Sequence, residues 1–165
     1  MKLLIANRGE IAVRIIRTCR DLGIASVVGY CDFERDAQYV LLADEAYALG
    51  ENANAFMDGD AFLAIAKRAG ATAIHPGYGF LSESAEFAQA VQNAGLIWVG
   101  PESSALKALG DKASARAVAA SVNVNPVPGC EHAELTNANV EEFIAVHGYP
   151  VVIKKLTAAA DTESR

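Results

Sequence analysis

Short apolar runs alternate with segments of helical length along the first hundred residues, and this alternation is the strongest constraint on the fold. The apolar run 3–6 is followed by apolar residues at helical spacing over 10–22, and then by a second apolar run over 24–30. Uninterrupted apolar runs of this length are typical of strands that are buried on both faces. Strands that alternate with helices pair in parallel, so the sequence predicts an α/β fold with a doubly wound parallel sheet.

The same alternation continues to about Pro101, and the remaining elements can be placed from it. Up to that point we expect helices over 39–42, 60–69 and 84–94, and strands over 46–49, 73–74 and 96–99. After Pro101 we expect helices over 103–109, 113–120 and 140–146, and a strand over 151–154. In the first helix the apolar stripe Ile11, Ile15, Cys19 and Leu22 is expected to face the core.

Composition narrows the possible partners and the compartment. The net charge is −6 and the pI is about 5.0, which disfavours nucleic acid and anionic membranes as partners. Three cysteines without a CxxC pair indicate reduced thiols rather than a disulfide framework or a zinc site. The opening apolar run is too short for a signal peptide or a membrane span, so we expect a cytoplasmic protein.

One connection after a predicted strand is a candidate ligand turn, because open α/β sheets bind ligands beyond the carboxyl ends of their strands. It reads Asn7-Arg8-Gly9-Glu10, in which Gly9 permits a close backbone turn and the following helix start could receive an anion. The turn lacks the GxGxxG spacing of a dinucleotide site. The residue types alone favour a plain turn in which Arg8 pairs with a neighbouring acid.

A second connection, His75 to Glu83, has one proline and two glycines within its first five residues. Such a loop has a special backbone shape. Tyr78 and Phe80 offer flat apolar surfaces, and the glycines leave amide groups open to a polar ligand. Two interpretations stay open, a ligand loop and a rigid loop whose rings cap the core. His75, without a nucleophile or second ligand beside it, is more often structural.

Two lysines differ from the other charged residues in their sequence context. Lys112 lies in a Gly-Asp-Lys turn at the start of a predicted helix, where its cation could reach a phosphate. Lys154 ends the apolar run 151–153, and a charge at the end of a buried strand costs free energy unless it has a partner. The plainer alternative is that both lysines are solvated. The residues alone therefore indicate an α/β domain with a ligand loop, for a ligand that could be anionic.

Several segments, in the same order along the chain, resemble the biotin carboxylase family. They are Lys2–Arg17, Ala43–Ala46, the loop His75–Glu83, Val99–Pro101 and Gly110–Lys112. The resemblance runs from Lys2 to about Lys154. The family supplies the first half-reaction of acetyl-CoA, propionyl-CoA, pyruvate and urea carboxylases.

The resemblance implies a domain plan and a reaction. Residues 1–111 would form a Rossmann-like domain, 112–155 the start of an ATP-grasp domain, and 156–165 a disordered tail. The complete enzyme would use MgATP and bicarbonate to form carboxyphosphate and then carboxylate biotin on a carrier protein. A carboxyltransferase would be its second partner, in fatty acid or acyl-CoA metabolism.

The resemblance also implies roles for particular residues. Lys112 and Lys154 match lysines that contact ATP in the family, and phosphoryl transfer depends on such positioned positive charge. Tyr78 and Gly79 lie in the loop that rests against biotin. Another matching pair, Arg17 and Asp21, lies at the family's homodimer contact, so a weak homodimer is expected.

The chain departs from the family pattern after Lys154. The family continues there into a glycine-rich loop that closes over the phosphates, and its metal-binding carboxylates, bicarbonate-binding arginine and base follow later. Here the sequence reads from Lys155 to Arg165 without that loop. We therefore expect these residues to lack a complete catalytic set and a metal site, and to bind ATP, Mg or biotin only weakly. Two alternatives remain open, a naturally short non-catalytic interaction module and a fragment of another ATP-grasp ligase such as a carbamoyl-phosphate synthetase.

Overall fold

Five parallel strands form the centre of the N-terminal part of the chain, in the spatial order β3-β2-β1-β4-β5. Their bounds are β1 (Lys2–Ile5), β2 (Ala25–Cys31), β3 (Glu45–Gly50), β4 (Ala73–His75) and β5 (Ile97–Trp98). The predicted doubly wound parallel sheet is confirmed. The chain leaves β1 for β2 and β3 on one side, then returns to the other side of β1 for β4 and β5. The point where the winding reverses therefore lies between β1 and β4.

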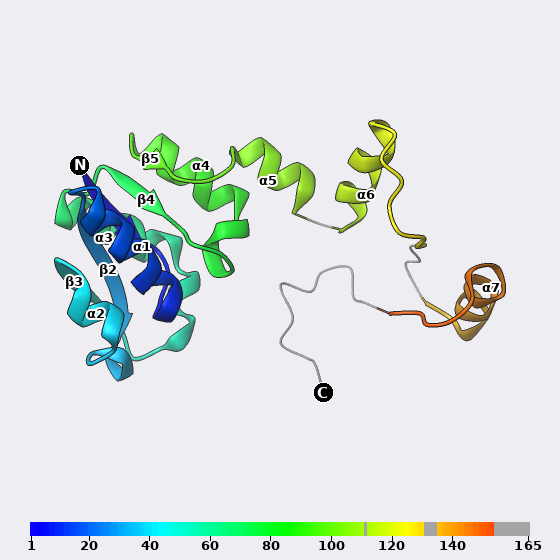
Figure 1. The fold of residues 1–165 in the computed structure, drawn as a ribbon, viewed down its shortest axis with the longest axis horizontal. Coiled ribbons are helices and arrows are strands. Elements are labelled where there is room, and N and C mark those ends of the chain that lie inside the picture. Colours follow the sequence, from blue (N-terminus) through cyan, green and yellow to red (C-terminus); the bar gives the residue numbers. More distant parts are fainter. Residues whose placement is uncertain (111, 131–134, 154–165) are drawn as a thin grey trace. The chain divides into compact units, whose positions relative to one another are not determined.

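The computed structural model describes residues 1–110, 112–130 and 135–153. The chain divides into two compact units, Met1–Lys107 and Ala108 onward. Within the first unit the sheet is covered on both faces by helices (Figure 1). One face carries α1 (Gly9–Asp21) and α2 (Gln38–Leu42), and the other carries α3 (Gly59–Ala69) and α4 (Ala85–Asn93). Three short 3-10 helices complete it, η1 (Asp32–Glu34), η2 (Ala53–Met57) and η3 (Phe80–Glu83).

The central strand β1 is apolar from Leu3 to Ile5 because both of its faces are buried there. Leu4 packs among the residues of α3 and α4, whereas Leu3 and Ile5 pack among those of α1 and α2. Both Leu4 and Ile5 are fully buried. Burial of such a side chain stabilises the fold by about 1.5–3 kcal/mol. Because β1 has no solvent-facing side, a polar residue is not tolerated at alternate positions.

The buried face of α1 differs from the predicted stripe. The residues that it buries are Ala12, Val13, Ile16 and Cys19. Of the predicted stripe, Cys19 is buried, but Ile11 and Ile15 are only partly buried and Leu22 is 67% exposed. Small Ala12 lets the helix approach the sheet closely, so the contact is centred about one residue away from the largest side chains.

Local signals fix the ends of the helices on the other face. The Asp58 carboxylate accepts the Ala61 amide at the start of α3, and the Ser84 hydroxyl accepts the Phe87 amide at the start of α4. Such caps satisfy amides that the helix leaves unpaired. Gly70 ends α3 in the left-handed conformation, which glycine adopts without a steric penalty. The bounds predicted for these two helices, 60–69 and 84–94, are thereby confirmed to within one residue.

The later residues form three helices, α5 (Ser103–Leu109), α6 (Lys112–Ser121) and α7 (Asn137–His147). The segment rich in proline after α6 is not helical, as predicted, and its carbonyls are bound by a side chain of that helix. The Arg116 guanidinium donates to the Val127 and Gly129 carbonyls. Thr136 and Asn139 form a reciprocal capping box at the start of α7.

The prediction of a strand over 151–154 is wrong for residues 151–153, which are the part of it that the structure describes. Residues 151–153 have no regular structure, and Val152 and Ile153 are 77% and 63% exposed. A strand needs a paired neighbour to be stable, and the described residues offer this segment none. Lys154 and the predicted tail 156–165 lie outside the described residues.

Across the ranges that the structure describes, no helix is long and apolar enough to cross a membrane.

Candidate functional site

A buried asparagine joins the two connections that meet where the winding of the sheet reverses. Asn7, directly after β1, is fully buried, and its Nδ2 donates to the carbonyls of Pro76 (2.7 Å) and Tyr78 (2.9 Å) after β4. Its Oδ1 accepts the Arg8 amide at 2.9 Å. The Asn7 side chain thus makes three hydrogen bonds, each to a backbone group. The sequence does not single out Asn7 within its turn, although an amide beside an apolar strand is a signal for such a bridge.

The bridge leaves room only for glycine at position 77. A Cβ atom on Gly77 would lie 2.6 Å from Asn7 Nδ2 and 2.7 Å from Ile11 Cγ2. Its φ of +68° is also one that side-chain-bearing residues rarely adopt. Gly77 thus permits the close approach of the loop to β1, which is a packing reason for the His-Pro-Gly opening.

His75 braces the same turn from within β4. Its Nδ1 accepts the Gly77 amide at 3.0 Å, which assigns the ring proton of the neutral imidazole to Nε2. Burial lowers the pKa of His75, because desolvation disfavours the charged form. The structural role expected for His75 is therefore confirmed.

Tyr78 and Gly79 form the exposed crest of the loop. The Tyr78 side chain is 65% exposed, and its hydroxyl donates to Glu10 Oε1 at 2.7 Å. This hydrogen bond raises the pKa of Tyr78, so the phenol is neutral at pH 7. No atom lies within 4 Å of the position that a Cβ on Gly79 would take. The crest thus presents an exposed aromatic ring beside a half-buried glycine that has no neighbouring group over its Cα.

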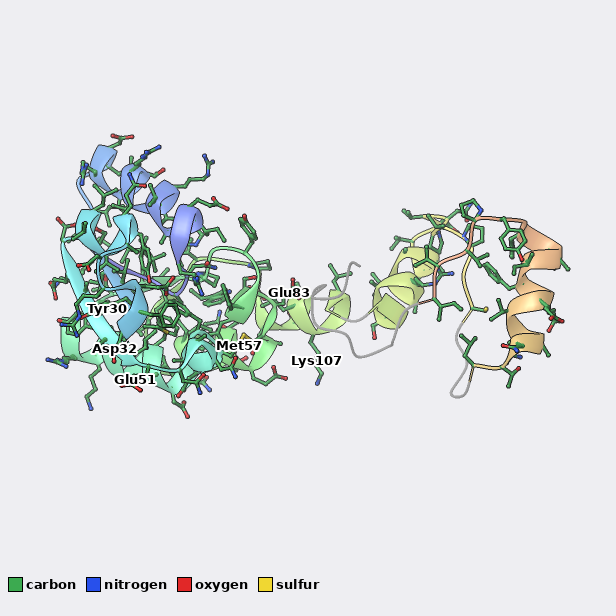
Figure 2. The ribbon with its side chains drawn as sticks, turned by 90° about the horizontal axis from the view of Figure 1, so that it is seen from below. Tyr30, Asp32, Glu51, Met57, Glu83 and Lys107 are labelled. Carbon is green, nitrogen blue, oxygen red and sulfur yellow. The ribbon has the colours of Figure 1, made fainter. Side chains whose placement is uncertain are left out.

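In the Asn7–Glu10 turn the arginine is already paired with a carboxylate. Arg8 Nε lies 2.9 Å from Glu34 Oε1, so the plainer interpretation, pairing with an acid, is confirmed. Carboxylates also follow β2 and β3 where Cys31 and Gly50 lie side by side, and Figure 2 labels two of them, Asp32 and Glu51. Acidic side chains therefore follow both strands, and one of them, Asp32, lies 3.8 Å from the Arg35 guanidinium.

The other predicted site residues are found on α1, in the second unit, or outside the described residues. Arg17 and Asp21 are both exposed on α1. Lys112 is the first residue of α6, in the second unit, and Lys154 lies outside the described residues. Among the described residues, no group of three or more His, Cys, Asp or Glu side chains could hold a metal ion. The structure therefore brings together Tyr78 and Gly79 with Asn7, Glu10 and His75, and it does not test the roles predicted for the lysines.

The comparisons with known proteins point to one family. The family described as biotin carboxylase, N-terminal domain, matches residues 1–106. The chain is 48% identical over 155 residues to the biotin-dependent acyl-coenzyme A carboxylase alpha3 subunit of Mycobacterium leprae, covering 93% of this chain and 26% of that protein. It is 44% identical over 158 residues to biotin carboxylase 1 of Bacillus subtilis, covering 93% of this chain and 34% of that protein.

Solved structures give the same result. The biotin carboxylase domain of a single-chain bacterial carboxylase is 44% identical, with a TM-score of 0.81, covering 89% of this chain and 34% of that one. The biotin carboxylase domain dimer of the Hydrogenobacter thermophilus 2-oxoglutarate carboxylase, in complex with MgADP, ADP and bicarbonate, is 39% identical with a TM-score of 0.81. The match covers 90% of this chain and 33% of that one. The chain thus spans about a quarter to a third of these relatives.

The half-buried His75 predicts a pH dependence of stability. In the unfolded chain the His75 imidazole binds a proton near pH 6.5, whereas in the folded chain it does so only at a lower pH. The free energy of unfolding should therefore fall as the pH decreases below about 6.5. Urea unfolding at pH 7.5 and 5.5 measures this decrease.

Two substitutions separate the proton from the hydrogen bond. His75→Asn keeps an acceptor for the Gly77 amide, so it should reduce the pH dependence while retaining most of the stability at pH 7.5. His75→Leu should reduce the pH dependence equally but lose stability at both pH values. A pH dependence unchanged in both variants would show that His75 does not cause it.

Proposed function

The chain belongs to the biotin carboxylase N-terminal domain family, and we propose that it serves as the first domain of a biotin-dependent carboxylase. The complete enzyme would use MgATP and bicarbonate to carboxylate biotin on a carrier protein, and a carboxyltransferase would receive the product. The observation that supports this role best is the loop 75–83, which Asn7 ties to the end of β1 while the Tyr78 ring stays exposed. In this proposal the loop forms one wall of the site for the biotin ring.

The chemistry of the loop crest suits biotin better than a phosphate. Biotin has a compact, largely apolar ring system with a polar, uncharged ureido edge. The exposed face of Tyr78 can contact the apolar part, and the open backbone at Gly79 can approach the polar edge. Arg8, the cation of the Asn7–Glu10 turn, is paired with Glu34 and is therefore not free to bind an anion.

Nucleotide binding belongs to the second unit in this proposal. Residues from Lys112 would begin an ATP-grasp domain, with Lys112 and Lys154 directed to the phosphates of ATP. MgATP, when bound, would supply the phosphoryl group that activates bicarbonate. A lysine at the start of α6 could add its charge to a phosphate near that helix start.

A cytoplasmic location is part of the proposal. It is supported by Cys19 and Cys31, which are free thiols in the core of the first unit. Burial raises the pKa of both thiols and keeps them protonated and unreactive. Free core thiols are compatible with a reducing compartment, and the reaction draws on ATP.

Assayed alone, these 165 residues should show no bicarbonate-dependent ATPase activity, because two lysines cannot replace the metal-bound charge that phosphoryl transfer needs. Free biotin at millimolar concentration should shift amide NMR signals of Tyr78 and Gly79 while leaving those of β2 and α3 unchanged. Tyr78→Ala should abolish these shifts, and Tyr47→Ala, on β3, is the matched control that should preserve them.

Two results would contradict this proposal. One is ATP turnover that disappears on Lys112→Ala, which would show a complete catalytic site. The other is a biotin response that does not involve the loop, or the absence of any response at millimolar concentration.

We propose in addition a weak homodimer through the outer face of α1. Arg17 and Asp21 lie one turn apart and exposed, opposite the face that buries Ala12 and Ile16. A two-fold contact is self-complementary, so Arg17 of each chain could meet Asp21 of its partner. The relative from Hydrogenobacter thermophilus is named as a dimer. Exposed ion pairs contribute only about 0.2–1 kcal/mol each, so such a contact alone makes a weak dimer.

Sedimentation equilibrium should therefore find a monomer at micromolar concentration and self-association only at much higher concentration. Arg17→Glu should weaken the association, because it places two carboxylates at each contact. The charge-exchanged variant Arg17→Glu/Asp21→Arg should restore it. A tight dimer that Arg17→Glu leaves unchanged would show that another surface drives assembly.

A further inference from the structure

Phe80 holds a backbone conformation that needs support from its surroundings. Its φ is +48°, a left-handed value that residues with bulky side chains adopt only where neighbouring groups enforce it. The ring of Phe80 packs on that of Phe56, with centroids 5.7 Å apart and planes tilted by 37°. Phe80 directly follows the exposed crest of Tyr78 and Gly79. The contacts that hold the Phe80 ring therefore also fix the orientation of the crest that precedes it.

Arg8 contacts the same Phe56 ring. Its guanidinium carbon lies 5.6 Å from the centroid of the fully buried Phe56 ring and 6.0 Å from that of Phe33. Both distances fall within the range of a cation–π interaction. Glu34 keeps the guanidinium in place with one carboxylate oxygen, while its other oxygen accepts the Tyr39 hydroxyl at 3.2 Å. The Arg8 guanidinium thus contacts both Glu34 and the Phe56 ring, while its side chain stays 37% exposed.

We propose that Arg8 is a positioning residue for the loop crest, acting through Phe56 to hold Phe80 in its left-handed conformation. Successive residues after β1 then hold the two halves of the loop. Asn7 binds the carbonyls of Pro76 and Tyr78, and Arg8 braces the ring of Phe80. The identity of the ligand at the crest rests on the proposed biotin function, but the positioning role does not.

Hydrogen exchange of the ligand-free chain tests this role. The amides of Ser82 and Ser84 report on the loop, because they donate to the carbonyls of Gly79 (3.0 Å) and Leu81 (3.2 Å). Arg8→Met, which keeps an unbranched side chain but removes the charge, should increase their exchange rates by about tenfold or more. The amides of α4 should be unaffected. Arg8→Lys keeps the charge without the planar group, so its effect should be intermediate.

A double-mutant cycle separates this role from general stabilisation. Phe80→Leu should by itself increase loop exchange, and adding Arg8→Met should then increase it little further, because both changes break the same chain of contacts. Should Arg8→Met not fold, Glu34→Gln releases the guanidinium more mildly and should show the same non-additivity with Phe80→Leu.

The outcomes are distinguishable from those of the biotin titration. Loop exchange that is unchanged in the Arg8 variants, additive effects in the cycle, or an equal increase in α4 would overturn the positioning role. Loss of the biotin response with the cycle intact would overturn the proposed ligand and leave the role of Arg8 standing.

Discussion

The two hydrogen bonds from Asn7 to the Pro76 and Tyr78 carbonyls are the interaction on which the rest of the candidate site depends. They cross the point where the sheet reverses its winding, and so they connect two loops that are about seventy residues apart in sequence. Because Asn7 is fully buried, the loss of either partner would leave a buried polar group that has neither a hydrogen-bond partner nor water. The close approach requires Gly77, and the Gly77 turn in turn requires the acceptor on His75.

This arrangement distinguishes the domain from nucleotide-binding domains whose parallel sheets have the same strand order. Such sheets leave the crevice at the switch point open to a phosphate. Here the polar groups at this point are used within the protein, since Asn7 binds backbone carbonyls and Arg8 is paired with Glu34 near two aromatic rings. What remains exposed is the crest of the loop, with Tyr78 and Gly79. A ligand there meets an aromatic ring and open backbone, which is consistent with an uncharged ring system such as biotin.

Much of the fold could be predicted from the sequence because local signals agreed with the final packing. The buried β1 shows as an uninterrupted apolar run, and Gly70 and Ser84 mark helix ends. The face of α1 was mispredicted because Ala12 carries little hydrophobic signal although it forms the contact. The strand over 151–153 was mispredicted because apolar content cannot show whether a partner strand is present. For the site, the sequence indicates the loop but not Asn7 as its anchor, since that role depends on a contact between distant segments.

The free energy of unfolding of Asn7→Asp, compared with that of the unchanged chain across pH, tests the anchor most directly. The substituted carboxylate would face two carbonyl oxygens in a buried position, so at neutral pH the variant should be about 3–5 kcal/mol less stable. Burial and the carbonyls would raise the pKa of this carboxyl, so the deficit should shrink as the pH falls and a proton lets it donate to one of them. The contribution of His75 cancels in the comparison. A deficit below about 1 kcal/mol that does not change with pH would contradict the account, because it would mean that the hydrogen bonds of Asn7 do not hold the loop.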